Sequence, residues 1–256
     1  CLLLIPVTML RDFARLVGIG KCVSFLKAHK IFVRVLHRSA IKHGFTVCVE
    51  GNIASGKTTF FEYFKKFSSL VEVHEEPVKQ WRNIHGHNAL AKMYEDPKRW
   101  GLTFQSYVQM TMLDMHLKKQ KRPIKMVERS IYSAKCFVEN LHRNRSVLDL
   151  EYIVLSEWFD WILKAHNIKV DLMVYLQTRP DVVLQRIRDR NRAEEQRITL
   201  EYVQALHDLH EEWLIKKSKF YTPCQVLVLD ANSDLSKMHK IYEERKSEIL
   251  FGLGDT

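Results

Sequence analysis

The run GNIASGKT at residues 51–58 matches the phosphate-binding pattern G-x-x-x-x-G-K-[ST] at every fixed position. Its glycines let the backbone turn tightly enough for consecutive N–H groups to bind phosphate oxygens beside a helix N-terminus. Lys57 brings a positive charge to the β- and γ-phosphates, and the Thr58 hydroxyl can bind Mg²⁺. The loop therefore predicts a nucleotide site made of Gly51, Asn52, Ile53, Ala54, Ser55, Gly56, Lys57, Thr58 and Thr59.

Two further segments carry groups suited to phosphoryl transfer. Glu76, in HEEPVKQW, follows a short apolar run and precedes Pro77, which ends regular strand pairing. The run KMVERS ends in Glu128 and Arg129, which we expect at the same level of the sheet. A carboxylate near the phosphate loop can accept the proton of a hydroxyl that attacks the γ-phosphorus. An isolated acid at a strand end is more often solvated, but three polar groups at adjacent strand ends favour an active site.

Short apolar runs alternate along the chain with longer stretches of helical spacing. We expect strands at 46–50, 70–73, 125–127, 172–176 and 226–229. We expect helices at 59–67, 99–117, 131–141, 150–165, 181–192, 200–216 and 235–249. This alternation predicts an α/β fold, with a five-stranded parallel sheet flanked by helices. No linker divides residues 45–256, so we expect one domain there.

The phosphate loop alone leaves the reaction open among GTPases, motor ATPases and small-molecule kinases. The NKxD and DxxG motifs of a GTPase are absent. Asp230 ends an apolar strand as in a motor ATPase, but only one expected helix follows it, so we assign it a structural role. A kinase with a small acceptor fits best.

Several motifs in one order resemble the deoxynucleoside kinases of the thymidine kinase 2/deoxycytidine kinase type. They are GNIASGKTT, EEPVKQWRN, FQSYVQMTML, ERSIYSAKCFVEN, RNRAEEQ and LHDLHEEWLI, and they run from about residue 45 to about residue 231. The mitochondrial thymidine kinases and the insect multisubstrate kinases are the most similar branches. The resemblance implies a P-loop kinase fold with an Arg-rich lid, ATP as phosphate donor, Mg²⁺ and a deoxynucleoside acceptor.

The resemblance also implies the catalytic roles. Glu76 is the general base for the 5′-hydroxyl, and Arg129 holds that oxygen and stabilises the transferring charge, together with Lys57. Glu128 and Thr58 help to hold Mg²⁺. The arginine run Arg186, Arg188, Arg190 and Arg192 forms a lid over the ATP phosphates, because guanidinium groups bind phosphate with two hydrogen bonds.

For the acceptor, the resemblance implies a pocket in which Gln105 pairs with the base edge, since its amide offers both a donor and an acceptor. Aromatic rings enclose the base, and Tyr94 with Glu195 binds the 3′-hydroxyl. Family members usually have one more residue before Phe137, but spacings of three and four share a helix face, so Phe137 should still reach the base. The full implied set is Glu76, Trp81, Met93, Tyr94, Gln105, Val108, Met112, Arg129, Ala134, Phe137 and Glu195.

The deoxycytidine kinase branch has Arg and Asp where this chain has Met112 and Ala134. An uncharged pocket with room for a methyl group favours thymidine, with deoxycytidine and deoxyuridine also accepted. We therefore expect ATP-dependent phosphorylation of pyrimidine deoxynucleosides to the monophosphate in nucleotide salvage. A thymidylate-type monophosphate kinase is the first alternative, but it needs a clamp for the acceptor phosphate, and only Arg129 is available. A nucleotide-binding subunit without turnover is the second, and the joint presence of Lys57, Glu76 and Arg129 speaks against it.

The positive charge of this 256-residue chain is concentrated at one end. Residues 1–44 hold eight basic residues against one acid, whereas the other 212 hold 32 against 29. Because basic and acidic residues are nearly equal in number in the folded part, its composition does not indicate a nucleic-acid-binding surface. No apolar run is long enough to span a membrane. The basic segment has the pattern of a mitochondrial transit peptide, with Met9 as a candidate start. The alternative is a basic tail on a cytosolic or nuclear enzyme.

The cysteine pattern and two of the expected helices complete the expectations. Five scattered cysteines without a CxxC pair argue against a zinc site or a disulfide framework and fit a reducing compartment. The stretches 102–117 and 150–166 carry more apolar surface than one sheet face requires, including Trp158 and Trp161. Because the family pairs two such helices across a four-helix interface, the resemblance implies a homodimer.

Overall fold

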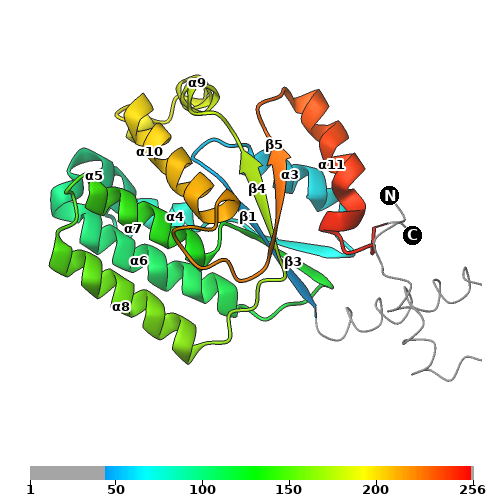
Figure 1. Ribbon diagram of the computed structural model, residues 1–256, viewed down its shortest axis with the longest axis horizontal. Helices are drawn as coiled ribbons and strands as arrows, with labels where there is room; N and C mark the ends of the chain where they lie inside the picture. Colours follow the sequence, from blue (N-terminus) through cyan, green and yellow to red (C-terminus); the bar gives the residue numbers. More distant parts are fainter. Residues whose placement is uncertain (1–43, 255–256) are drawn as a thin grey trace, which may run out of the picture.

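The computed structural model describes residues 44–254, and the expected transit segment lies outside this range except for its last residue. Five parallel strands form one sheet in the order β2-β3-β1-β4-β5 (Figure 1). They are β1 (Phe45–Glu50), β2 (Val71–His74), β3 (Ile124–Glu128), β4 (Leu172–Gln177) and β5 (Gln225–Asp230). The predicted α/β class and the five-stranded parallel sheet are confirmed.

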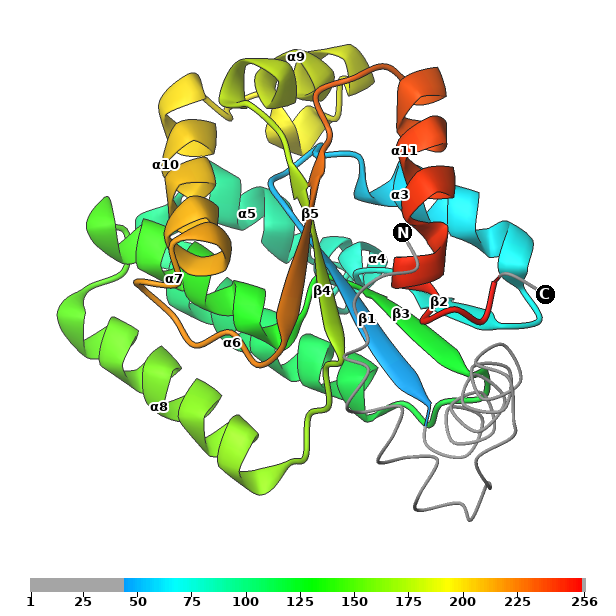
Figure 2. The ribbon, with the colours of Figure 1, turned by 45° about the vertical axis from the view of Figure 1, so that its right-hand side comes forward.

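The sheet is buried on both faces because its inner strands are apolar at successive positions. In β1, Val47 and Val49 face one layer of helices and Cys48 faces the other. The first layer consists of α3 (Lys57–Phe64), which continues into the 3-10 helix η1 (Lys65–Phe67), and α11 (Leu235–Ile249). Figure 2 shows α3 and α11 on one side of the sheet and α6, α7, α8 and α10 on the other. Helices on both faces of a parallel sheet are the doubly wound arrangement that the alternating pattern predicts.

The second layer forms the larger part of the core. It contains α4 (Val78–Arg82), α5 (Ala89–Glu95), α6 (Pro97–Leu117), α7 (Ala134–Arg143), α8 (Asp149–Ala165) and α10 (Leu200–His210). A short 3-10 helix, η2 (Ile131–Ser133), precedes α7, and α10 continues into a π-helical turn, η4 (Glu211–Ile215). The helices α4 and α5 were not predicted.

Helix α6 is fixed at both ends by side chains. Asp96 caps its N-terminus by accepting a hydrogen bond from the Arg99 N–H, and Pro97 occupies the first turn. At the other end, Lys125 of β3 is buried and its Nζ donates to the carbonyls of His116 and Lys118. A cation at the negative end of the helix dipole stabilises α6 against the sheet.

The arginine-rich segment forms a small unit above the phosphate loop. Helix α9 (Pro180–Arg190) packs with α10 and Ile53 around a separate apolar cluster. It ends at Arg190 because Asn191 adopts a left-handed conformation, with φ of 46°. Arg192 therefore lies beyond the helix that was expected at 181–192, just before the 3-10 helix η3 (Ala193–Glu195). Within residues 44–254, no helix is both long and apolar enough to cross a membrane.

Candidate active site

A cavity of about 980 Å³ opens at the carboxyl ends of the strands. Strand β1 pairs with β3 on one side and with β4 on the other, so the chain connections on the two sides of β1 run in opposite directions across the sheet. Doubly wound folds bind their ligands at such a switch point. Most residues expected in the site line this one cavity, and they come from the phosphate loop, β3, the helices α3, α4, α5, α6 and α7, and the lid. Those residues are Ile53, Ala54, Ser55, Gly56, Lys57, Thr58, Thr59, Glu76, Trp81, Met93, Tyr94, Gln105, Val108, Met112, Glu128, Arg129, Ala134, Phe137, Arg190, Arg192 and Glu195.

The phosphate loop needs glycine at both ends. Gly56 caps α3 with φ of 98°, a left-handed conformation that favours glycine. At Gly51, a Cβ would lie only 2.6 Å from the Ser55 Oγ and 2.9 Å from the Leu176 carbonyl oxygen. Asn52 lies behind the loop, where its Nδ2 donates to the Val203 carbonyl of α10 at 2.8 Å. Gly51 and Asn52 therefore shape the loop without lining the cavity.

Lys57 begins α3 and points into the loop. Its Nζ donates to the carbonyl oxygen of Asn52 at 2.7 Å and to that of Gly51 at 3.3 Å. Burial, reinforced by the neighbouring charge of Arg129, lowers the pKa of Lys57. A bound phosphate would favour the charged form of this amine by supplying the opposite charge.

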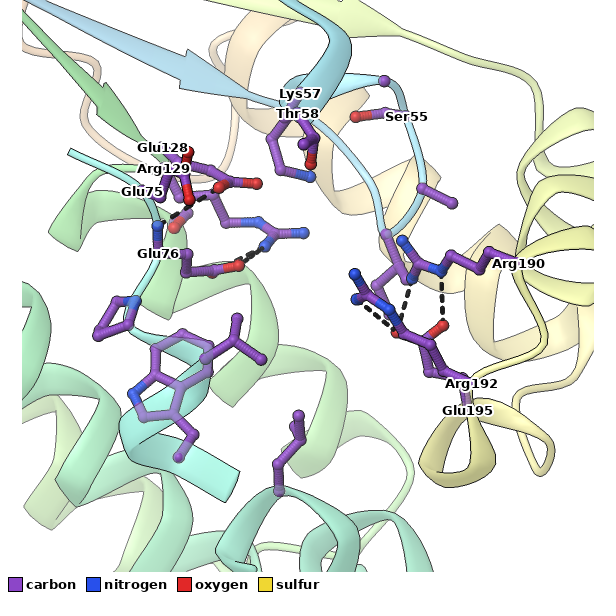
Figure 3. A pocket seen from close by; sticks show the side chains of 18 of the residues that line it. Ser55, Lys57, Thr58, Glu75, Glu76, Glu128, Arg129, Arg190, Arg192 and Glu195 are labelled. Carbon is purple, nitrogen blue, oxygen red and sulfur yellow. Dashed lines mark hydrogen bonds and ion pairs between the residues drawn. The ribbon is translucent and has the colours of Figure 1, made fainter. Parts of the chain in front are cut away.

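Glu76 and Arg129 form a buried ion pair beside the loop. Arg129 Nη1 donates to Glu76 Oε1 at 2.7 Å and to Oε2 at 2.6 Å, as the dashed line in Figure 3 indicates. Arg129 adopts a left-handed backbone conformation, with φ of 55°, while its N–H donates to the Val49 carbonyl. Such strain is characteristic of functional sites, because the surrounding structure must hold the residue in place.

Glu128 lies next to this pair and faces the phosphate loop. Its Oε2 accepts a hydrogen bond from the Glu76 N–H at 3.3 Å. Burial, with a contribution from the charge of Glu76, raises the pKa of Glu128. A nearby divalent cation would favour the ionised carboxylate. Within residues 44–254, no cluster of three or more His, Cys, Asp or Glu side chains could bind a metal ion without other ligands.

The other half of the cavity is largely apolar. Gln105 of α6 is 2% exposed, and its Oε1 has no hydrogen-bond partner in the described part of the chain. Trp81 of α4 donates from Nε1 to the Thr111 hydroxyl at 2.9 Å, which fixes its ring in the wall. The Phe137 ring centroid lies 5.0 Å from the Arg129 guanidinium carbon, and Phe137 lines the cavity, as expected at its shorter spacing from Ala134. A buried amide among apolar side chains can recognise a planar polar ligand.

The lid faces the ion pair across the cavity, as Figure 3 shows. Arg190 donates to the Glu195 carboxylate from Nε at 2.7 Å and from Nη2 at 2.6 Å, and Arg192 lies 3.5 Å from it. Arg188 is exposed and does not line the cavity, whereas Arg186 does. Residues 186 and 190 share a helix face and residue 188 does not, because an α-helix has 3.6 residues per turn.

Two groups of lining residues carried no recognisable sequence signal. Arg82 ends α4 and lines the cavity. The segment after β5 and the start of α11 close the cavity beyond the phosphate loop. They contribute Ala231, Ser233, Asp234, Leu235, Met238 and Tyr242.

Comparison with known proteins places this site in a family. The family model for deoxynucleoside kinase matches residues 47–250, which is most of the chain. The chain belongs to the deoxynucleoside kinase family. This kinase is 52% identical over 205 residues to mitochondrial thymidine kinase 2 of Homo sapiens, covering 80% of this chain and 77% of that protein. It is 35% identical over 234 residues to deoxycytidine kinase of Mus musculus, covering 80% and 90% of the two chains.

These matches confirm the family that the sequence motifs indicated. The chain is a deoxynucleoside kinase, a phosphotransferase whose fold is the P-loop kinase fold, and ATP is the donor that this family implies. The similarity extends through both halves of the cavity, because the matched range includes the phosphate loop, the largely apolar half and the lid.

Proposed function

We propose that this deoxynucleoside kinase transfers the γ-phosphoryl group of ATP to the 5′-hydroxyl of thymidine, deoxycytidine and deoxyuridine. One observation carries the proposal: a single cavity contains a phosphate loop and a buried amide, Gln105, whose Oε1 has no hydrogen-bond partner among the described residues, with the Glu76–Arg129 ion pair beside them. A nucleoside whose base meets Gln105 would direct its 5′-hydroxyl toward that pair.

The chemistry follows from the groups around the acceptor oxygen. Glu76 accepts the proton of the 5′-hydroxyl as the oxygen attacks the γ-phosphorus. Arg129 binds the Glu76 carboxylate and so holds this general base in place. In the proposed complex, Arg129 also donates a hydrogen bond to the attacking 5′-oxygen. Lys57, Arg190 and Arg192 supply positive charge where the transferring phosphoryl group gains negative charge.

The site also fits Mg²⁺. The Thr58 hydroxyl and the Glu128 carboxylate both line the cavity near the phosphate loop, and they are the oxygen donors that this ion prefers. Phosphate oxygens and water would complete the set, which agrees with the lack of an all-protein metal cluster among the described residues. When bound, Mg²⁺ neutralises phosphate charge and orients the donor.

Pyrimidine preference is supported by the uncharged wall beside Gln105. Val108, Met112 and Ala134 line the pocket and leave an apolar surface for the thymine methyl group. The relatives include thymidine kinase 2 and deoxycytidine kinase, both named for pyrimidine acceptors. Tyr94 and Glu195 line the same cavity, where we assign them to the 3′-hydroxyl.

We further propose that the kinase domain spans residues 45–256, that it forms a homodimer through α6 and α8, and that residues 1–44 direct it to mitochondria. Large apolar side chains on the outer faces of these helices support the dimer, among them Met110, Ile153, Trp158 and Trp161. The mitochondrial location of the relative thymidine kinase 2, together with the basic composition of residues 1–44, supports mitochondrial targeting.

Parallel assays of the purified full chain with ATP test the reaction. The acceptors are thymidine, thymidine monophosphate and none, and chromatography identifies the products. We expect thymidine monophosphate from thymidine, no diphosphate from the monophosphate, and little ATP hydrolysis without an acceptor. Diphosphate formation would instead identify a nucleoside monophosphate kinase. Absence of turnover with all acceptors would favour a nucleotide-binding subunit.

A further inference from the structure

An ion pair joins the lid directly to the acceptor half of the cavity. Arg82, the last residue of α4, donates from Nε to Oε1 of Glu194 in η3 at 2.7 Å, and its Nη2 donates to the same oxygen. The two residues are 112 positions apart in the chain. Their side chains are 35% and 11% exposed, so the contact is partly shielded from water.

Other contacts hold the same lid segment on the acceptor side. Arg197 Nη1 donates to the carbonyl of Glu95, the last residue of α5, at 3.3 Å. The rings of Tyr94 and Tyr202 meet edge to face, with centroids 6.3 Å apart. The segment that follows α9 is therefore fastened to α4 and α5, which carry Trp81, Met93 and Tyr94.

The charges of the lid segment are divided between its two sides. Arg190 and Arg192 lie on Glu195, whereas the adjacent Glu194 faces Arg82. Burial opposes ionisation of Glu194, but a backbone hydrogen bond and the Arg82 guanidinium lower its pKa below the usual range. Glu194 is thus ionised at neutral pH, when its partner Arg82 is also charged.

We propose that Arg82 is a positioning residue that latches the lid to the nucleoside side, so that Arg190 and Arg192 are held over the phosphate loop. The inference rests on the proposed function, because it assigns the lid arginines to ATP. A tethered lid loses less conformational entropy when ATP orders it. A nucleoside that orders α4 and α5 would also order the lid, so each substrate would tighten the binding of the other.

A direct contact between Arg82 and a substrate is the competing explanation, because Arg82 itself lines the cavity. A double-mutant cycle separates the two. If Arg82 acts only through Glu194, then Arg82→Gln, Glu194→Gln and the double variant should have the same effect. If Arg82 binds phosphate directly, the two single effects should add.

The measurements are kcat, the KM for ATP and for thymidine, and the affinity for a non-hydrolysable ATP analogue with and without thymidine. We expect each single variant to raise the KM for ATP about five- to twenty-fold and to change kcat by less than about threefold. In each variant, thymidine should no longer increase the affinity for the ATP analogue. Arg82→Lys retains the charge but not the two-pronged donor, so it should fall between the wild type and Arg82→Gln.

Arg245→Gln provides the matched control, since Arg245 forms an ion pair with Glu248 on α11 and does not line the cavity. It should leave every value unchanged. Additive effects in the cycle, or an unchanged KM for ATP in folded Arg82→Gln, would overturn the proposal. Because analogue binding needs no turnover, an inactive wild type that still shows the coupled, non-additive binding would contradict only the proposed function.

Discussion

Glu76, the proposed general base, is held in place by hydrogen bonds with its neighbours. Both of its carboxylate oxygens accept from Arg129 Nη1, and its own N–H donates to Glu128. These bonds fix the carboxylate in the cavity at the side of the phosphate loop. Arg129 in turn is fixed by a hydrogen bond from its backbone N–H to β1.

The first prediction is that Glu76→Gln lowers kcat by about 10²- to 10⁴-fold, because the amide cannot accept the 5′-hydroxyl proton. The affinity for thymidine should change only a few fold, since the amide can still hydrogen-bond. Steady-state kinetics and thymidine titration measure both values.

Glu75→Gln is the matched control for this variant. Glu75 is the adjacent carboxylate and also lines the cavity, but it forms an ion pair with Lys65 instead of Arg129 and is half exposed. It should retain nearly normal turnover. Normal turnover by folded Glu76→Gln would exclude Glu76 as the base.

The second prediction concerns base selection by two side chains of the pocket. Met112→Arg combined with Ala134→Asp adds a charged pair beside Gln105 and fills the space assigned to the thymine methyl group. The ratio of kcat/KM for thymidine to that for deoxycytidine should therefore fall. Competition between the two nucleosides in one reaction measures this ratio. If the ratio stays constant, these residues do not contact the base.

At the scale of the element, β1 ends in a buried acid directly before the phosphate loop. Glu50 is fully buried, and its Oε1 accepts a hydrogen bond from the Ser130 N–H at 2.8 Å. The bond ties the end of β1 to the residue after Arg129. Burial raises the pKa of Glu50 to about 7, although hydrogen bonds from Ser130 and the charges of Arg129 and Lys57 oppose the rise.

The third prediction follows from this raised pKa. Between pH 4.5 and about 7, the folded protein retains a proton on Glu50 that the unfolded chain releases. Glu50 therefore stabilises the fold fully below pH 4.5, and that stability is lost as the pH rises to about 7. Glu50→Gln is neutral throughout. The free energy of unfolding of Glu50→Gln minus that of the wild type should therefore increase by about 2–3 kcal/mol between pH 4.5 and pH 8.

Denaturant unfolding of both proteins at several pH values measures this difference, in which the titration of all other groups largely cancels. Glu62→Gln, a change to an exposed carboxylate on α3, is the control and should show a flat difference. A flat difference for Glu50→Gln as well would mean that Glu50 ionises normally in the fold.

Elements with strong local patterns could be predicted from the sequence. All five strands lie within two residues of their expected bounds, because each contains a short run rich in apolar residues and the inner strand β4 is apolar at successive positions. The helices α4 and α5 have five and seven residues, which is too short for a period of 3.6 to be visible. Asn191 ended α9 early because its left-handed conformation has only a weak signal in the sequence.

Among the site residues too, those with a local sequence pattern could be predicted and those brought together by the fold could not. The phosphate loop could be found because its residues are contiguous and each has a chemical reason to be there. The ion pair between Arg82 and Glu194 could not, since it joins residues 112 positions apart through the fold. Arg188 could be separated from Arg186 and Arg190 only once the helix phase was known.

At the scale of the molecule, α8 has an outer face on which large apolar side chains remain exposed in the described part of the chain, residues 44–254. Leu150, Ile153, Trp158 and Trp161 on this helix are more than half exposed, as is Met110 on the neighbouring α6. A contiguous apolar surface of this kind is uncommon on a monomer and is typical of an interface.

The fourth prediction is that Trp161→Glu converts a dimer into a monomer, because a buried carboxylate without a partner is costly at an interface centre. Sedimentation velocity measures the mass, and circular dichroism checks the fold. Leu200→Glu is the control, since Leu200 is an exposed apolar residue at the start of α10, a helix that lies apart from α8 (Figure 1). A wild type that sediments as a monomer, or an unchanged dimer in Trp161→Glu, would contradict the interface.

The central claim is that the phosphoryl group of ATP passes to the 5′-oxygen of a pyrimidine deoxynucleoside bound beside Glu76 and Arg129. The most direct test follows the label from γ-³²P-ATP in the presence of thymidine or of 5′-deoxythymidine, which lacks only the attacking hydroxyl. We predict labelled thymidine 5′-monophosphate from thymidine and no labelled nucleotide product from 5′-deoxythymidine. Transfer to 5′-deoxythymidine, or no transfer to thymidine by the folded protein, would contradict the account.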